Sequence, residues 1–328
     1  MPQDETGRTG DEFRDFPLRV GVALGAGSAA SIAEIGALQV FAEAGIPIHC
    51  VAGTSAGAIV GAAFAAGQLK ELGASLASLS RGGVLRLFDL VWPREGLLSG
   101  RRGLEFVAEH LGERIEELAL PFAAVATDLR TGGEVVMTRG PVFDAVRASI
   151  ALPGIFTPWR IGGRLLVDGG LVNPIPVSAA RALGAEFVIA LNVLPLSDEN
   201  ETRATLSQHL SLIHASPAGD AGETPDHEVD ETLGLLEVVS QASTIMESQV
   251  AKGRLREDPP GWLLQIPVPA VGIFDVHRAE ELVEIGRQSA KEALPELRAA
   301  LEAAVPLLQR LLDLPRKAAA LLPSTATD

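Results

Sequence analysis

Short apolar runs alternate with longer helical stretches over residues 18–66. Residues 18–24 form a short run, rich in β-branched side chains, of the kind that central parallel strands show. The pattern then predicts a helix for residues 30–44, a second strand for residues 48–51 and an apolar helix for residues 56–66. This order is that of a right-handed βαβ unit. We therefore predict an α/β fold in which helices cover parallel strands.

The same alternation continues along the rest of the chain. Further strands are predicted for residues 121–126, 134–138, 164–167, 187–193 and 262–266. Further helices are predicted for residues 143–150 and 232–251, from residue 278 onward, and for residues 301–312. The helix at 232–251 carries an apolar stripe made of Leu235, Val238, Val239, Ala242, Ile245 and Met246. The leucine-rich face of the last helices indicates core or partner contact, with membrane-surface contact as the alternative.

Residues 68–120 are predicted to form helices with two interruptions. The first falls at Gly82 and Gly83, because glycine weakens a helix interior. The second is the apolar loop at residues 92–96. We interpret this loop either as a flap over a substrate or as a loop packed beneath charged side chains.

Changes in composition divide the chain into three regions. Residues 1–16 are polar and charged and are predicted to be a disordered tail. Residues 17–295 are predicted to be one domain, interrupted at residues 196–230 by an acidic, mobile insertion. Residues 296–328 are predicted to be a helical extension and tail.

Charge and aromatic content exclude one class of partner. The chain has 328 residues, a formal net charge of −15 and 4% aromatic residues. Nucleic-acid binding depends on clustered basic residues and on stacking aromatics, so we expect no nucleic acid. The single cysteine, Cys50, lies in an apolar run and is interpreted as a buried, inert thiol. Since neither a signal peptide nor a membrane-spanning run is visible, we expect a cytoplasmic protein whose contact with a membrane, if any, is peripheral.

Candidate chemistry begins where the second predicted strand ends. Gly53-Thr54-Ser55-Ala56-Gly57 matches the G-x-S-x-G pattern, in which a tight turn between strand and helix exposes a nucleophilic serine. Gly53 and Gly57 allow the strand and helix backbones to approach closely. The alternative is a helix N-cap formed by Thr54 or Ser55. The pattern alone leaves both interpretations open.

A loop of small residues follows the first strand, and we expect it at the same sheet edge as Ser55, where strand C-termini meet. Its backbone amides, together with that of Ala56, are candidates for an oxyanion hole. The loop residues concerned are Gly25, Ala26, Gly27 and Ser28. The alternatives are a plain strand-to-helix turn and half of a dinucleotide fingerprint. Against the fingerprint, its third glycine position holds Ala30.

A serine nucleophile needs a base within hydrogen-bond reach. Asp168 follows a predicted strand and precedes Gly169 and Gly170, so a tight turn can aim its carboxylate at the site. The alternative is an Asx-turn residue that bonds its own backbone. His277 is a second candidate base, but helix-start chemistry explains its position. Because an ordinary aspartate has a pKa of ~3.9, a Ser55–Asp168 dyad predicts a slow enzyme unless the carboxylate is desolvated.

Five short motifs occur in order along the chain. They are LGAG at residues 24–27, IGAL at 35–38, GTSAG at 53–57, ASIALPGIF at 148–156 and VDGGLVNPIP at 167–176. Together they resemble the patatin-like phospholipase family, over residues 18–290. The resemblance implies a three-layer α/β/α fold with a central, mostly parallel sheet, and a lipid acyl hydrolase in which Ser55 is the nucleophile and Asp168 its base.

The first loop departs from the usual pattern of that family. Ala30 and Ser31 stand where a basic residue and a glycine are usual, and Glu34 stands where a histidine is common. Losing one oxyanion donor typically costs ~2.7–4 kcal/mol of transition-state stabilisation. A changed loop geometry therefore predicts reduced activity.

The sequence favours a serine esterase that cleaves lipid or other acyl esters through an acyl-enzyme. The alternative is a lipid-binding or regulatory scaffold with weakened catalysis, and a nucleotide-binding protein built on the Gly25 loop is a third, disfavoured option. We predict neither a metal nor a cofactor, because the histidines of the acidic insertion lack the spacing of metal ligands. These are His209, His214 and His227. The oligomeric state stays open.

Overall fold

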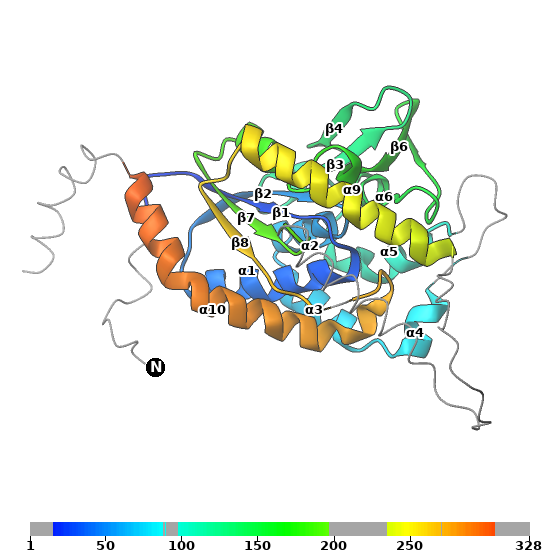
Figure 1. The fold of residues 1–328 in the computed structure, drawn as a ribbon, viewed down its shortest axis with the longest axis horizontal. Helices are drawn as coiled ribbons and strands as arrows, with labels where there is room; N and C mark the ends of the chain where they lie inside the picture. The colour runs from blue at the N-terminus through cyan, green and yellow to red at the C-terminus, as the bar shows by residue number, and fades with distance from the viewer. Residues whose placement is uncertain (1–15, 88, 90–97, 197–234, 270, 306–328) are drawn as a thin grey trace, which may run out of the picture.

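A computed structural model of the chain describes residues 16–87, 89, 98–196, 235–269 and 271–305. Within these residues, one sheet has the strand order β5-β6-β3-β2-β1-β7-β8, with β4 paired to β3 (Figure 1). The strands are β1 (Val20–Leu24), β2 (Ile48–Thr54), β3 (Phe122–Asp128), β4 (Glu134–Met137), β5 (Trp159–Ile161), β6 (Arg164–Asp168), β7 (Phe187–Asn192) and β8 (Trp262–Gln265). Strands β3, β2, β1, β7 and β8 pair in parallel, whereas the pairs that include β4, β5 or β6 are antiparallel. The predicted α/β fold with a central, mostly parallel sheet is confirmed.

Helices cover both faces of this sheet. The α-helices are α1 (Ala33–Glu43), α2 (Ala56–Ala65), α3 (Leu69–Ala77), α4 (Arg81–Arg86), α5 (Arg101–Val107), α6 (Val142–Ser149), α7 (Val177–Ala182), α9 (Leu235–Glu257) and α10 (Ala279–Ala304). The short 3-10 helices are η1 (Ser28–Ile32), η2 (Ala108–His110), η3 (Ile115–Glu117), η4 (Gly169–Leu171) and η5 (Asp275–Arg278). Figure 1 shows α9 on one side of the sheet and α1 and α10 on the other.

Alternate residues of the central strands supply two hydrophobic cores. Val22 and Leu24 of β1 pack into the core that contains α1, α2 and α10. Ala23 packs on the opposite face, with Cys50 of β2 and the buried side of α7. Successive strand residues point to opposite faces, and both faces are covered, so these strands are apolar throughout. Burial raises the pKa of the Cys50 thiol, in agreement with an inert cysteine.

The predicted helix break at Gly82 and Gly83 is wrong, because both residues lie inside α4. The Ser80 hydroxyl accepts a hydrogen bond from the Gly83 amide, and the Ser80 carbonyl accepts one from the Val84 amide. Val84 itself is buried. Capping by Ser80 and burial of Val84 therefore outweigh the low helix propensity of glycine.

Helix α9 presents part of its predicted apolar stripe to solvent. Val238, Ile245 and Met246 are 45%, 44% and 50% exposed, whereas Ser243 and Glu247 are buried. Periodicity locates an apolar face of a helix but does not say which face packs on the protein. The polar side of α9 therefore faces the domain, and it brings Glu247 to the cavity described below.

Several predictions concern residues outside the described ranges. They are the tail at 1–15, the apolar loop at 92–96, the acidic insertion from residue 197 and the chain from residue 306 onward. Helix α10 runs without interruption across the predicted boundary at residue 295. No helix in the described part of the chain has both the length and the apolar character that crossing a membrane requires.

Candidate active site

Ser55 lies at a sharp turn between β2 and α2. Its backbone has φ 55° and ψ −128°, a conformation that costs a non-glycine residue of order 1–3 kcal/mol. A side chain at Gly53 would overlap the Gly57 carbonyl oxygen, and one at Gly57 would place its Cβ 2.6 Å from the Leu24 carbonyl oxygen. The Ser55 side chain makes no capping hydrogen bond to α2. The geometry is therefore that of a strained elbow that exposes a hydroxyl, rather than that of an N-cap.

The structure brings Ser55 and Asp168 together. The Ser55 hydroxyl donates a hydrogen bond of 2.7 Å to Asp168 Oδ2. The other carboxylate oxygen, Oδ1, accepts one of 2.8 Å from the Gly170 amide, which fixes the rotation of the carboxylate. A side chain at Gly169 would overlap the Val125 carbonyl oxygen, so the turn after β6 can pass close to β3 only with glycine here.

The environment of Asp168 makes it a stronger base than an exposed aspartate. The residue is 1% exposed, and this burial raises the pKa of its carboxyl to about 7. The hydrogen bonds from the Gly170 amide and the Ser55 hydroxyl act in the opposite direction and lower the pKa. A carboxylate with a pKa near neutrality is matched to the work of a general base.

The backbone around the pair is held by the segment that follows Asp168 and by α6. The Thr54 hydroxyl donates to the Asn173 carbonyl at 2.8 Å. The Ser55 amide donates to the Ser149 hydroxyl at 2.8 Å, and that hydroxyl donates to the Val125 carbonyl at 2.6 Å. Ser149 lies within the 148–156 motif, but its contact with the elbow depends on β3 and could not be inferred from the sequence.

The amides of the Gly25 loop divide into two groups. The Gly25 amide donates to the Leu191 carbonyl at 3.1 Å and to Glu34 Oε1 at 2.8 Å. The Ala26 amide donates to the Pro174 carbonyl at 2.8 Å. These two amides therefore have acceptors within the protein and are not free to donate to an oxyanion, contrary to the expectation for Gly25 and Ala26.

The next two amides, those of Gly27 and Ser28, have no such acceptor among the described residues. Ser28 has a positive φ of 52° and lines the same cavity as Ser55 and Ala56. Within the described chain, Ser28 and Ser55 are the non-glycine residues with positive φ. The two strained positions thus line one cavity.

Glu34 occupies a buried position behind this loop. Burial raises the pKa of its carboxyl well above the ordinary value, and the hydrogen bond from the Gly25 amide lowers it only in part. Its second oxygen, Oε2, has no hydrogen-bond partner among the described residues. Glu34 therefore holds its proton to higher pH than an exposed glutamate, and its Oε1 anchors the first residue of the loop.

A largely apolar cavity of about 190 Å³ adjoins the Ser55–Asp168 pair. Its walls come from η1, α2, α3, α5, the segment after α6, and η5 with the residues before it. The apolar residues that line it include Ile32, Ile59, Val60, Leu76, Leu104, Val107, Leu152 and Phe156. Its polar lining includes one carboxyl besides that of Asp168, namely Glu247 of α9, for which the sequence carries no local motif.

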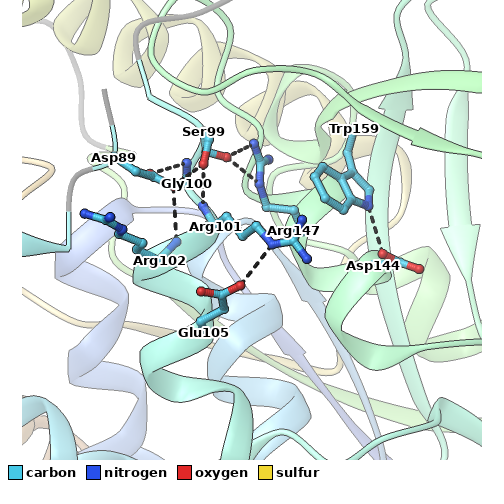
Figure 2. Close-up of polar contacts among 9 residues, drawn as sticks. All are labelled: Asp89, Ser99, Gly100, Arg101, Arg102, Glu105, Asp144, Arg147 and Trp159. Carbon is cyan, nitrogen blue, oxygen red and sulfur yellow. Dashed lines mark hydrogen bonds and ion pairs between the residues drawn. The ribbon is translucent and has the colours of Figure 1, made fainter. Parts of the chain in front are cut away.

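Arg147 of α6 bonds Ser99, as Figure 2 shows, and Ser99 precedes Gly100, which lines the cavity. Its guanidinium donates to the carbonyls of Ser99 and Thr157, and the distance to the latter is 2.8 Å. It also lies over the rings of Phe156 and Trp159, with its central carbon 5.9 Å and 5.1 Å from the ring centres. Burial lowers the pKa of Arg147 to about 10, so the group stays charged at neutral pH.

His277 lies apart from the pair. Its Nε2 accepts a hydrogen bond of 3.0 Å from Arg81, and the residue does not line the cavity described above. The geometry therefore favours Asp168 over His277 as the partner of Ser55.

Comparison with known proteins shows which family the chain resembles. A model of the patatin-like phospholipase family matches residues 22–181. An uncharacterized NTE family protein of Mycobacterium tuberculosis is 31% identical, and the alignment covers 84% of this chain and 91% of that protein. Lysophospholipase NTE1 of Mycosarcoma maydis is 30% identical over 84% of this chain, a region that makes up 15% of the fungal protein. Patatin-like phospholipase domain-containing protein 7 of Rattus norvegicus is 35% identical over 53% of this chain and 13% of its own length.

An α/β fold with a serine elbow beside a buried aspartate defines a class of acyl hydrolases. The chain belongs to the patatin-like phospholipase family. Membership supports a lipid hydrolase activity.

Proposed function

We propose that the chain is a carboxylic ester hydrolase that cleaves lipid acyl esters with Ser55 as nucleophile and Asp168 as its general base. The observation that carries the proposal is the 2.7 Å hydrogen bond from the Ser55 hydroxyl to Asp168 Oδ2. The strained elbow and the adjoining apolar cavity support it.

Acylation begins when Asp168 Oδ2 accepts the hydroxyl proton of Ser55 as its Oγ bonds to the ester carbonyl carbon. The carbonyl oxygen becomes an oxyanion, and the amides of Gly27, Ser28 and Ala56 are the available donors to it. The tetrahedral intermediate then breaks its bond to the alcohol oxygen. Asp168 returns the proton to that oxygen, the alcohol leaves, and an acyl-serine ester remains.

Deacylation repeats these steps with water. Asp168 accepts a proton from water as the water oxygen bonds to the acyl carbon. Collapse of the second intermediate breaks the bond to Ser55, which recovers its proton from Asp168. The fatty acid leaves, and the dyad returns to its starting state.

The apolar cavity fits the acyl part of such a substrate. Its lining offers aliphatic and aromatic side chains from several elements and few polar groups apart from Ser55, Asp168 and Glu247. The fungal relative is named a lysophospholipase. Single-chain lipid esters are therefore the first natural substrates to try.

A chromogenic ester and an active-site probe test the proposal. The wild type is expected to hydrolyse p-nitrophenyl butyrate and to be labelled at Ser55 by a fluorophosphonate. Ser55→Ala and Asp168→Asn are expected to lower kcat/KM by at least ~10³-fold, as the loss of a nucleophile or its base does in other hydrolases. Ser78→Ala, which removes an exposed hydroxyl, is the matched control.

The alternative is a lipid-binding scaffold, and the same experiment separates the two. A wild type that neither turns over the ester nor reacts with the probe would favour the scaffold. Equal turnover by the wild type and Ser55→Ala would exclude Ser55 as the nucleophile.

A further inference from the structure

Glu247 is a buried carboxyl that the steps above do not use. It lies on α9 and is 7% exposed, and it lines the cavity together with Ser55 and Asp168. A buried polar group normally has a hydrogen-bond partner within the protein. Among the described residues, burial and the charge of Asp168 are the causes that shift the pKa of the Glu247 carboxyl, and no hydrogen bond to it contributes. A substrate group in the cavity is thus a natural partner.

The position of Glu247 is fixed relative to the dyad. Helix α9 packs on η4, the turn that follows Asp168. A Cβ added at Gly170 would lie 2.7 Å from Glu247 Oε1, and the Gly170 amide is the donor to Asp168 Oδ1. Glu247 therefore sits on the Asp168 side of the site, behind the same glycine turn.

This placement decides which part of an ester Glu247 would meet. In the proposed mechanism Asp168 returns its proton to the alcohol oxygen, so the alcohol must lie on the Asp168 side. The acyl chain has the aliphatic part of the cavity, where Ile59, Val60 and Leu104 lie. Glu247 therefore faces the alcohol part of the substrate.

The protonation state of Glu247 defines what it can recognise. Burial, together with the negative charge of Asp168, raises the pKa of Glu247 well above its ordinary value. The residues of η4, against which α9 packs, are Gly169, Gly170 and Leu171, and none of them ionises. The Glu247 carboxyl therefore holds a proton to higher pH than an exposed glutamate, and a protonated carboxyl offers both an O–H donor and a carbonyl acceptor.

We propose that Glu247 is a specificity-determining residue, whose carboxyl hydrogen-bonds a hydroxyl that the substrate carries on its alcohol part, beside the scissile ester. A substrate hydroxyl can donate to a carboxyl oxygen, and it can also accept from the carboxyl when that group is protonated, so the two groups can satisfy each other. A site that hydrogen-bonds a substrate hydroxyl discriminates against an analogue without it, because its own polar groups then stay unpaired. The inference rests on the proposed function and adds a substrate feature to it.

Two esters of one acyl chain test the inference. The substrates are 1-decanoylglycerol, which has free hydroxyls, and propyl decanoate, which has none. The measured quantity is the ratio of their kcat/KM values in a single preparation, because the fraction of folded enzyme cancels in that ratio. The wild type is expected to favour decanoylglycerol.

Three variants complete the experiment. Glu247→Leu is expected to lower the ratio about 10-fold, with propyl decanoate affected less than decanoylglycerol. Glu247→Gln keeps a donor and an acceptor and is expected to retain most of the preference. Ser248→Ala is the control, because Ser248 is buried next to Glu247 but bonds the Thr244 carbonyl within its own helix.

The outcomes separate this inference from the proposed function. A wild-type ratio that survives in Glu247→Leu, whether or not both rates fall, would overturn the role of Glu247 while the hydrolase stands. A wild type that cleaves neither ester would overturn the proposed function itself, and the inference with it.

Discussion

At the scale of single residues, the site is governed by carboxyl groups in unusual surroundings. Asp168, Glu34 and Glu247 are all buried, and burial raises the pKa of each. The three groups have different surroundings: Asp168 accepts a hydrogen bond from the Ser55 hydroxyl, Glu34 accepts one from the Gly25 amide, and Glu247 lines the cavity. Environments that separate the protonation states of neighbouring carboxyls allow one fold to assign them different roles.

The pKa of Asp168 predicts the acid limb of the activity profile. Asp168 must be ionised to accept the Ser55 proton, so kcat/KM should rise as the pH increases through about 7. Initial rates of p-nitrophenyl butyrate hydrolysis, measured from pH 5 to pH 9, at a wavelength where product absorbance is independent of pH, give the profile. Full activity at the acid end of this series would mean that Asp168 keeps an ordinary pKa and that burial does not tune it.

The raised pKa of Glu34 predicts how the free energy of unfolding changes with pH. A carboxyl whose pKa is raised by folding adds stability below its unfolded pKa of 4.5, and this contribution is lost as the pH rises through the folded value. Glu34→Gln keeps an acceptor for the Gly25 amide and cannot ionise. Its free energy of unfolding should therefore fall less than that of the wild type between pH 5 and pH 8, as measured by urea titration. Glu71→Gln, on the exposed side of α3, should follow the wild type.

At the scale of elements, the site depends on loops that distant segments tie together. Figure 2 shows Arg147 reaching from α6 to Ser99, whose hydroxyl bonds Asp89. The same guanidinium donates to the Thr157 carbonyl. Gly100 and Phe156, next to these partners, line the cavity. One buried cation thus joins two segments of the cavity wall.

Removal of this cation should loosen the wall. In Arg147→Met, the carbonyls of Ser99 and Thr157 lose their donor, and a buried unpaired group costs ~1–3 kcal/mol. We expect the free energy of unfolding to fall by ~2–4 kcal/mol, with a higher KM for long-chain esters. Arg101→Met, which removes an exposed pair with Glu105, should cost less than ~0.5 kcal/mol. Equal effects of the two substitutions would show that Arg147 is not a structural link.

Local patterns explain what the sequence could predict. The strand-turn-helix order places Ser55 at an elbow, and the two glycines after Asp168 mark a tight turn; each follows from adjacent residues. The use of the Gly25 and Ala26 amides could not be predicted, because their acceptors belong to Leu191 and Pro174. The position of Glu247 in the site could not be predicted for a similar reason, since it depends on which face of α9 packs on the domain.

At the scale of the whole molecule, two helices that are far apart in the sequence pack together. Helix α10, near the C-terminus, packs along α1, near the N-terminus, on the face of the sheet opposite α9 (Figure 1). Gly36 of α1 and Gly286 of α10 lie at the closest approach. A side chain at Gly36 would overlap the Val283 carbonyl, and one at Gly286 would overlap the Ala33 carbonyl. This backbone contact closes the fold around the first βαβ unit.

Two glycine substitutions in long helices are expected to have opposite effects on the free energy of unfolding. Gly286→Ala forces the helices apart and should destabilise the protein by ~2 kcal/mol or more, as overpacking does. Gly253→Ala, in α9, meets open space and should stabilise it by ~0.5–1 kcal/mol through helix propensity. Thermal unfolding measures both, and ~1 kcal/mol corresponds to a shift of ~2–4 °C in Tm for a domain of this size class. An unchanged Tm in this variant would mean that the two helices can separate without cost, and that α10 is not needed to hold the first βαβ unit together.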